Sequence, residues 1–270
     1  MRNISLFCSE KGAGQIRAYQ IAPLLNARIN PTEGYEDDIC IYVKKEPPIN
    51  HPRHSYLDIV DARERISWLL RNPNIGVIAS SDVAQMFLSK RLNRKDILLI
   101  PQQHCNFERF KRDRKEIKVA GFIGVPNSMV WPLEEVEKKL KDIGVELKIN
   151  TTYKKREDVV NFYKQIDIQI LFRTCYTVIN KRVSEGLLRT CLKLQNASSF
   201  GIPTVSFPEP GYVEEYEGLF IEAYSLDSLI DGVKALKESK ELYNSYVTKG
   251  LEKAEQYHID NIIKLYKKLK

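Results

Sequence analysis

The sequence lacks any apolar run long enough to cross a lipid bilayer. Its most apolar stretches, such as Ile75–Ala79 and Ile97–Ile100, are far shorter than the roughly 18 residues that a spanning helix needs. The N-terminal run Ile4–Cys8 is followed directly by charged residues and does not resemble the apolar region of a signal peptide. These absences predict a cytoplasmic protein, and peripheral attachment at the inner face of a membrane stays open.

Cysteine and histidine are scarce and scattered. The cysteines are Cys8, Cys40, Cys105, Cys175 and Cys191, and no two of them have the C-x-x-C spacing of a zinc or redox pair. The four histidines show no H-E-x-x-H or comparable spacing. The pattern favours a reducing compartment, and we expect neither a metal centre nor a bound cofactor.

Two common nucleotide-binding motifs are also missing. Gly12 and Gly14 follow the first apolar run, but Arg17 stands where the G-x-G-x-x-G dinucleotide fingerprint has its third glycine. No complete G-x-x-x-x-G-K-[ST] phosphate loop occurs. A nicotinamide-dependent dehydrogenase is therefore disfavoured. The two glycines either form a simple turn or belong to a loop that approaches a ligand closely.

What the sequence does have is an ordinary globular composition with an excess of basic residues. Of 270 residues, 43% are hydrophobic and 29% are charged, which excludes disordered and collagen-like chains. Lys and Arg number 42 against 35 Asp and Glu, a net charge of +7. Such a balance either favours anionic partners or only keeps the surface soluble. Nucleic acid is the least favoured partner, because no aromatic RNA-binding signature or zinc module is present.

Short β-type runs alternate with helical patterns along most of the chain. The predicted strands are Asn3–Cys8, Ile39–Val43, Tyr56–Val60, Ile75–Ala79, Ile97–Ile100, Val119–Ile123, Glu146–Ile149, Ile166–Leu171, Thr204–Phe207 and Leu219–Glu222. The predicted helices are Gln15–Arg28, Ala62–Asn72, Leu133–Ile143, Arg156–Lys164, Cys191–Phe200, Leu226–Glu238, Glu241–Gln256 and Ile259–Leu269. This alternation predicts an α/β fold with parallel sheets and helices on both faces.

The polar stretch Asn106–Lys118 divides the alternation into two series and is interpreted as a linker. We therefore expect two Rossmann-like parallel-sheet domains, an N-terminal one at residues 1–105 and a C-terminal one at 118–256, followed by a helix at 257–270. Ligands of open parallel sheets bind beyond the carboxyl ends of the strands. The two sheets are accordingly expected to face a central cleft.

The most specific segment is Lys193–Ser206, a predicted helix closed by Gly201 and followed by a strand. Its residues K-L-Q-N-A…G-I-P-T-V resemble the K-x-x-E/N-A…G-x-P-x-V signature in the C-terminal domain of GT-B glycosyltransferases, particularly the bacterial group 1 or family 4 enzymes. Pro208–Glu215 resembles their acidic, sugar-facing turn. Further similar segments are Tyr224–Leu229, Leu242–Tyr243 and Gly250–Ala254, and more weakly Ser80–Asp82 and Leu99–Pro101 on the acceptor side.

The resemblance implies that the C-terminal domain binds a nucleoside diphosphate sugar. Lys193 and Arg173 would stabilise the negative charge that develops on the departing diphosphate, without a metal ion. Asn196, one helical turn after Lys193, would bond a ribose or sugar hydroxyl. The implied donor-binding residues are Gly124, Lys193, Asn196, Glu209, Tyr212 and Glu215. Each of them is also compatible with an ordinary surface or turn position.

On the acceptor side the implied loop residues are Gly12, Gly14 and Asp61. Asp58 and Asp61 flank the end of the third predicted strand and can serve as a base, although Asp61 can equally cap the helix that follows. His104, near the proposed hinge, is a candidate for proton transfer or is a plain loop histidine. The basic last helix either crosses back to the N-terminal domain, as in many GT-B proteins, or contacts an acidic membrane.

Family 4 enzymes usually carry two glutamates eight residues apart in this region, whereas this sequence has Leu188 and Asn196, with Glu185 as a nearby acid. The leading interpretation is a glycosyltransferase that moves a sugar from a nucleoside diphosphate sugar to a glycan, lipid-linked or other hydroxyl acceptor, in polysaccharide or glycoconjugate biosynthesis. The alternatives are a non-catalytic nucleotide- or sugar-binding protein on a degenerate GT-B fold and a sugar-nucleotide epimerase. Binding without transfer would indicate the first alternative, and a change in the sugar without an acceptor the second.

Overall fold

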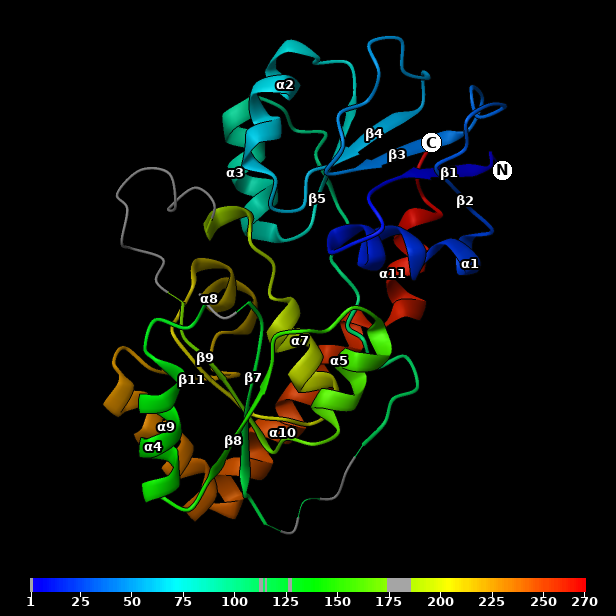
Figure 1. Ribbon diagram of the computed structural model, residues 1–270. Helices are drawn as coiled ribbons and strands as arrows, with labels where there is room; N and C mark the ends of the chain where they lie inside the picture. Colours follow the sequence, from blue (N-terminus) through cyan, green and yellow to red (C-terminus); the bar gives the residue numbers. More distant parts are fainter. Residues whose placement is uncertain (1, 112–113, 115, 126–127, 174–185) are drawn as a thin grey trace. The chain divides into compact units, whose positions relative to one another are not determined.

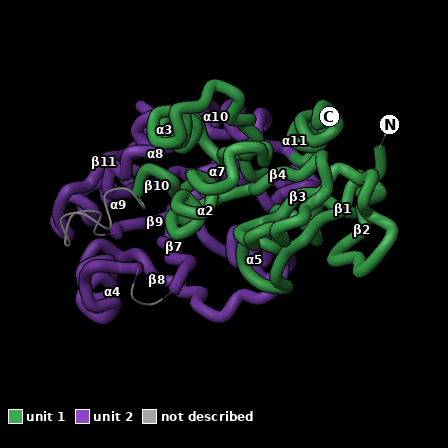
Figure 2. The backbone as a smooth tube through the Cα atoms, turned by 90° about the horizontal axis from the view of Figure 1, so that it is seen from above, with its two compact units in different colours: residues 1–103, 178–191, 259–270 green, residues 104–177, 192–258 purple. Residues whose placement is uncertain are grey.

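Two all-parallel sheets, each covered by helices, organise the chain. The computed structural model describes residues 2–111, 114, 116–125, 128–173 and 186–270. Unit 1 comprises Met1–Gln103, Val178–Cys191 and Ile259–Lys270, and unit 2 comprises His104–Thr177 and Leu192–His258 (Figures 1 and 2). Each unit contains one sheet. The predicted α/β class with two Rossmann-like parallel sheets is confirmed.

The unit 1 sheet has the strand order β2-β1-β3-β4-β5-β6. The strands are β1 (Ile4–Phe7), β2 (Arg28–Ile29), β3 (Ile39–Val43), β4 (Ser55–Asp58), β5 (Gly76–Ala79) and β6 (Leu98–Leu99), and every pairing is parallel. All residues of β1 and β3 are buried, as expected for central strands covered on both faces.

Helices cover both faces of this sheet. They are a π-helical turn η1 (Gln15–Tyr19), α1 (Ala22–Leu25), a short 3₁₀ turn η2 (Arg63–Arg65), α2 (Ile66–Arg71), α3 (Asp82–Leu92) and α11 (Ile259–Tyr266). Leu69 of α2 and Leu88 of α3 join Leu57 and Val77 in one core cluster. Figure 1 shows α2 and α3 on one side of the sheet and α1 and α11 on the other.

Two helix predictions in unit 1 were wrong. The segment predicted as one helix, Gln15–Arg28, breaks after Tyr19 and ends at Leu25, where Asn26 adopts a left-handed φ of 51°. Pro23 removes a backbone N–H within the segment, and a left-handed Asn is a common helix end. Helix α3 was not predicted at all. It begins at Ser81, whose hydroxyl accepts a hydrogen bond of 3.1 Å from the Ala84 N–H.

The last helix, α11, belongs to unit 1. Its apolar side chains Ile259, Ile262, Ile263 and Tyr266 are buried, and the Arg17 guanidinium lies 5.6 Å from the centre of the Tyr266 ring. At the end of the chain the Tyr56 hydroxyl donates to the Lys270 carbonyl at 2.9 Å. Burial of these side chains accounts for the amphipathic pattern of the segment. None of the described helices combines the length and apolar character that crossing a membrane requires.

The unit 2 sheet has the order β11-β10-β9-β7-β8. Its strands are β7 (Val119–Ile123), β8 (Glu146–Asn150), β9 (Ile168–Leu171), β10 (Thr204–Ser206) and β11 (Ile221–Glu222), all parallel. Its helices are α4 (Leu133–Asp142), α5 (Arg156–Tyr163), α7 (Leu192–Ser199), α8 (Pro210–Tyr216), α9 (Leu226–Glu238) and α10 (Lys240–Ala254), and then the short turn η4 (Glu255–Tyr257). Figure 1 shows α4 and α9 on one side of this sheet and α5 and α7 on the other.

The strand order of unit 2 changes direction between β7 and β9. The chain passes from β7 outward to β8 and then returns to β9 on the other side of β7, so the connections after β7 and β9 diverge. Such a switch point opens a crevice at the carboxyl ends of the two strands, where parallel sheets bind their ligands. The residues after Ile123 and Leu171 therefore lie where a ligand is expected.

The segment interpreted as a linker packs against unit 2. The Asn106 side chain is buried and donates to the Ser199 carbonyl at 2.8 Å. Arg156 donates to the Cys105 carbonyl at 2.7 Å and pairs with Glu108 at 2.7 Å. The start of the connection between the two sheets is thus hydrogen bonded to helices α5 and α7 of unit 2.

Candidate active site

A lysine lies directly over a glycine at the switch point of unit 2. Gly124 follows β7 with a φ of 156°, and its N–H donates to the Asn150 carbonyl at 3.1 Å. A methyl group on Gly124 would lie 2.7 Å from Lys193 Nζ and 2.9 Å from Ser128 Oγ. The Lys193 ammonium is therefore close to the carboxyl end of β7, and a side chain at position 124 would displace it.

Buried side chains hold the first turn of α7, which carries Lys193. The Lys193 carbonyl accepts hydrogen bonds from Gln169 Nε2 at 3.1 Å and from the Tyr163 hydroxyl at 3.4 Å. The Nζ atom lies 5.5 Å from the centre of the Phe122 ring. A cation in the first turn of a helix adds to the positive end of the helix dipole. An anion at this point would be stabilised by the lysine and by the dipole together.

Three of the residues singled out from the sequence form one cluster beside this point. Arg173 follows β9, and Glu209 and Tyr212 lie at the start of α8, after β10. Arg173 Nε and Nη2 donate to the two Glu209 carboxylate oxygens at 2.6 and 2.9 Å, and Nη2 also donates to the Tyr212 hydroxyl at 2.8 Å. The Glu209 side chain is 3% exposed and that of Arg173 is 20% exposed. This cluster joins the ends of two neighbouring strands.

The segment Pro208–Glu215 was predicted as a turn, and this was wrong, because α8 begins at Pro210. Proline is favoured at the first position of a helix, where its missing N–H needs no partner. Both carboxylate oxygens of Glu209 already accept hydrogen bonds from Arg173. Contact of Glu209 or Tyr212 with a sugar therefore stays a prediction and requires these hydrogen bonds to be shared or rearranged.

Two other predicted donor residues make separate contacts within unit 2. Asn196 is buried, and its Oδ1 accepts a hydrogen bond of 2.8 Å from the Cys105 N–H. Glu215 is also buried, and its Oε2 accepts a hydrogen bond of 3.1 Å from the Tyr257 hydroxyl. Their roles toward a ligand stay predictions.

His104 is held in the interior of unit 2. Its side chain is buried, its Nδ1 accepts from the Asn106 N–H at 3.2 Å, and its ring lies edge-on to His258 with 5.3 Å between the ring centres. Burial, together with the neighbouring His258, lowers the pKa of His104 to about 4. The imidazole is therefore neutral at pH 7. Such a histidine contributes to stability whether or not it takes part in proton transfer.

This burial predicts an acid-sensitive unit 2. His104 binds a proton near pH 6.5 in an unfolded chain and near pH 4 in the folded one, so its contribution is complete above about pH 6.5 and is lost as the pH falls toward 4. We expect it to remove about 2 kcal/mol of stability between pH 7 and pH 5. In His104→Asn, whose amide oxygen can still accept from Asn106, the loss over this interval should be smaller by about that amount. Urea unfolding at pH 7 and pH 5 measures the stability of both proteins. An equal loss of stability in the wild type and in His104→Asn would contradict the prediction.

In unit 1 the loop after β1 needs its glycines for its own conformation. Gly12 has a left-handed φ of 56°, and a methyl group on Gly14 would lie 1.8 Å from the Ser9 carbonyl oxygen. The chain thus folds back on itself here too closely for any side chain at position 14. This requirement explains both glycines without a ligand, and a ligand contact of this loop stays a prediction.

The loops after β3 and β4 are joined by an ion pair. Lys44 Nζ lies 2.5 Å from Asp61 Oδ1, and both side chains are exposed. The expected capping role of Asp61 was wrong, since the short turn η2 has no side-chain cap. Between these residues and the sheet, Val60 adopts a φ of 50°, a rare and strained conformation for a β-branched residue. Strain of this kind marks a loop whose shape the surrounding structure imposes.

A buried ion pair in unit 1 was not predicted from the sequence. Arg17 Nε lies 2.6 Å from Asp58 Oδ2, and neither side chain is exposed. Arg17 Nη1 also donates to the carbonyls of Ile100 and Pro101, both at 2.8 Å. Asp58, a candidate base, is thereby committed to this pair. The available signal was an arginine within an otherwise apolar helical pattern.

Glu185 and Cys175 lie outside the described residues. Within the described part of the chain, no three His, Cys, Asp or Glu side chains are grouped so that they could hold a metal ion.

Comparison with known proteins identifies the fold. No family model matches the sequence, and no curated protein matches it. Solved structures do match. HepE from Anabaena, in a complex with UDP and glucose, matches with a TM-score of 0.64 and 10% identity over 99% of this chain and 98% of HepE. The chain has the GT-B fold.

Two further structures support this assignment. WaaG, a glycosyltransferase involved in lipopolysaccharide biosynthesis, matches with a TM-score of 0.63 and 9% identity over 97% of each chain. TarM of S. aureus matches with a TM-score of 0.62 and 15% identity over 93% of this chain. The chain spans 57% of the length of TarM but nearly all of HepE and WaaG. The resemblance to GT-B proteins drawn from Lys193–Ser206 is thereby confirmed at the level of the fold.

Proposed function

We propose that this chain is a glycosyltransferase that moves a sugar from a nucleoside diphosphate sugar to a hydroxyl acceptor in polysaccharide or glycoconjugate biosynthesis. The observation that carries the proposal is the Lys193 ammonium, which lies over Gly124 at the switch point of a GT-B chain. Similar structures hold UDP with glucose in HepE and UDP with GlcNAc in GtfA. A uridine nucleotide is therefore the first donor to test.

In the proposed reaction unit 2 binds the donor. As the bond between the sugar and the diphosphate breaks, negative charge grows on the departing phosphate oxygens, and Lys193 together with the first turn of α7 stabilises it. Arg173 holds Glu209 and Tyr212 at the adjacent strand end. These residues provide the charge stabilisation that a metal ion provides in other transferases, so we propose that transfer needs no metal.

The acceptor side of the proposal rests on unit 1. Asp61 is an exposed carboxylate in the loop after β4, and Lys44 pairs with it. A carboxylate in this position can accept the proton of an incoming hydroxyl. A lipid-linked acceptor would bring unit 1 to an acidic membrane surface, and the exposed lysines Lys264, Lys267, Lys268 and Lys270 supply the charge for such a contact.

Loss of nucleotide binding in a Lys193 variant tests the donor site. UDP, GDP, ADP, dTDP and CMP are compared as stabilisers in thermal unfolding, and a nucleotide at about 100 times its Kd stabilises the fold by about 2.7 kcal/mol. Because the lysine contacts the diphosphate, we expect Lys193→Met to weaken binding about tenfold. The stabilisation at the same concentration then falls to about 1.4 kcal/mol. Without nucleotide the variant should unfold within about 0.5 kcal/mol of the wild type.

The matched control is Lys249→Met, which removes an exposed lysine of α10 from the same unit. It should keep the full nucleotide shift. An unchanged shift in Lys193→Met would remove this lysine from the donor site. No shift with any nucleotide at millimolar concentration would contradict the donor site as a whole.

One observation favours a second candidate, a GT-B protein that binds a nucleotide sugar without transferring it. At the two positions where family 4 enzymes usually carry glutamate, Leu188 is buried in the core of unit 1 and Asn196 is bonded to the Cys105 backbone. Release of UDP from a UDP-sugar in the presence of acceptor mixtures distinguishes the two. Binding with no release and no transfer would favour the non-catalytic protein.

A further inference from the structure

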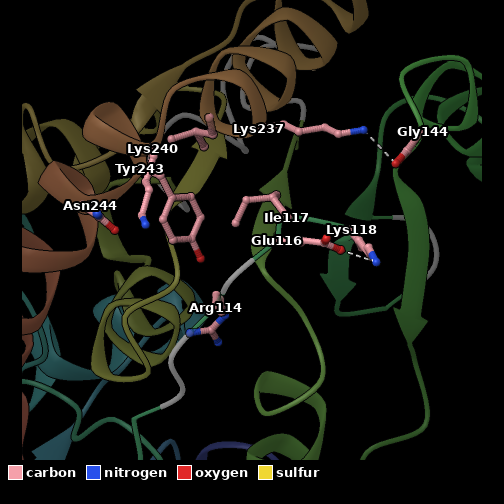
Figure 3. A pocket seen from close by; sticks show the side chains of 10 residues that line it. Arg114, Glu116, Ile117, Lys118, Gly144, Lys237, Lys240, Tyr243 and Asn244 are labelled. Atoms are coloured by element: carbon pink, nitrogen blue, oxygen red, sulfur yellow. Dashed lines mark hydrogen bonds and ion pairs between the residues drawn. The ribbon is translucent and has the colours of Figure 1, made fainter.

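A cavity of about 350 Å³ lies at the edge of the unit 2 sheet opposite to Lys193. Its walls are Arg114 and residues 116–118 before β7, the turn before β8, the end of α9 and the start of α10, all within unit 2 (Figure 3). The amino ends of β7 and β8 therefore border it. The donor proposed above occupies the carboxyl edge, so this cavity has no part in that proposal.

The charged residues that line the cavity are predominantly basic. They are Arg114, Lys118, Lys237 and Lys240 against a single acid, Glu116. Arg114 is almost fully buried and donates to the Ile166 carbonyl at 3.1 Å, so it fixes the wall rather than moving with solvent. Lys237 Nζ donates to the carbonyls of Ile143 and Gly144 at 2.6 and 3.0 Å. The single acid is paired with Lys118.

Lys240 is the lysine of this cavity whose side chain is not already engaged within the described residues. It is exposed, it is the first residue of the 15-residue helix α10, and its side chain forms no hydrogen bond or ion pair within the described residues. Its charge lies at the positive end of the helix dipole, where a cation is unfavourable and an anion is favourable. Figure 3 shows Lys240 and Tyr243 extending from this first turn, whereas Lys237 reaches toward Gly144.

The cavity wall also has a rigid apolar part, which a ligand would contact in addition to the lysines. The Tyr243 hydroxyl donates to the Asp167 carbonyl at 2.8 Å, which fixes its ring, and Leu236 is buried in the core beneath. The volume is at the lower end of the range for small-molecule sites. A small ligand fits both features if its phosphate contacts the lysines and the rest of the molecule packs against Tyr243. A macromolecule is too large to enter the cavity.

We infer that this cavity binds a small phosphorylated molecule, with the phosphate held by Lys118 and Lys240 and its body against Tyr243. Binding involves no covalent step. Lys118 must exchange Glu116 for the phosphate, and Lys237 remains bonded to the turn before β8. A ligand here would contact Arg114 and residues 116–118, which lead into β7.

Calorimetric titration with inorganic phosphate and with glucose 1-phosphate tests the site. All proteins carry Lys193→Met, so that binding at the proposed donor site is weakened equally in every protein compared. We expect Lys118→Met/Lys240→Met to weaken binding of glucose 1-phosphate at least tenfold, because the charge-assisted hydrogen bonds from both lysines to the phosphate are lost. The control Lys249→Met should bind as the background protein does. Thermal unfolding without ligand checks that the double variant is folded.

Equal affinity in the double variant and its background would overturn the inference, and so would the absence of any binding in the background. A third arm uses phosphatidylserine vesicles, because a lipid headgroup presents the same phosphate chemistry. Vesicle binding that depends on Lys118 and Lys240, without binding of the soluble phosphates, would overturn the small-molecule site in favour of a lipid surface.

Discussion

Replacing Arg17 by methionine is expected to lower the free energy of unfolding of unit 1 by about 3–5 kcal/mol. The guanidinium and the Asp58 carboxylate are both completely buried, with 2.6 Å between Nε and Oδ2. Methionine preserves much of the side-chain volume but leaves the Asp58 charge without its partner in the interior. It also removes the donor for the carbonyls of Ile100 and Pro101. A loss of this size is a large fraction of the stability of an ordinary domain.

Single-tryptophan proteins make the measurement specific to one unit. The chain has two tryptophans, Trp68 in α2 of unit 1 and Trp131 in unit 2. Urea unfolding followed by Trp68 fluorescence in a Trp131→Phe background reports unit 1, and the reciprocal protein reports unit 2. We expect Arg17→Met to shift the Trp68 transition and to leave the Trp131 transition closer to its original midpoint.

A double variant separates the lost ion pair from other effects of the substitution. In Arg17→Met/Asp58→Leu the uncompensated charge is gone, and apolar replacement of a buried pair is often close to neutral. We expect this protein to recover at least about 2 kcal/mol of the loss, with the remainder due to the two carbonyls. A loss below about 1 kcal/mol in Arg17→Met, or no recovery in the double variant, would contradict this account.

The strands were the most predictable part of the fold. Ile39–Val43 and Val119–Ile123 are confirmed to the residue. Strands of a parallel sheet covered on both faces form short uninterrupted apolar runs, so their limits are visible in the sequence. The order of the strands, and with it the switch point beside Gly124, follows from crossover connections that no local pattern contains.

Two helices were missed for different physical reasons. In α3 the apolar residues do not form one face, and Met86 among them is 67% exposed, so the helical period is weak. In α8 the residues Pro210 and Gly211 are typical of a turn. Proline at the first helical position and a buried glycine are nevertheless compatible with a helix. Local propensity alone does not distinguish these cases.

In the candidate site, individual residues could be singled out from the sequence, but their pairings with one another could not be predicted. The resemblance of the segment around Lys193 to the GT-B signature singled out the lysine that lies over Gly124. Arg173 and Glu209 were each assigned to a ligand, yet they bind one another across 36 residues of sequence. Two opposite charges at the ends of neighbouring strands can meet each other as well as a substrate. Which of them a ligand contacts depends on pairings that appear only in three dimensions.

This pairing yields the second prediction, a large loss of stability on replacing Arg173 by alanine. The Glu209 side chain is 3% exposed and accepts from Arg173 with both oxygens, so removal of the guanidinium leaves a buried carboxylate uncompensated. We expect unit 2 to lose about 2–4 kcal/mol, slightly less than a fully enclosed pair, because Arg173 retains some contact with solvent. The Trp131 transition in urea, measured in a Trp68→Phe background, reports the change.

The double variant Arg173→Ala/Glu209→Ala decides what the arginine does. If Arg173 serves to position Glu209 and the first turn of α8, removing both charges should restore at least half of the lost stability. Since both Nε and Nη2 are already engaged within the cluster, we expect the nucleotide-induced stabilisation to return with it. Restored stability without the nucleotide shift would instead show that Arg173 or Glu209 contacts the ligand directly, as their places at the ends of β9 and β10 first indicated. If the stability is not restored either, the cluster stabilises unit 2 through the packing of Tyr212 against the arginine rather than through the ion pair.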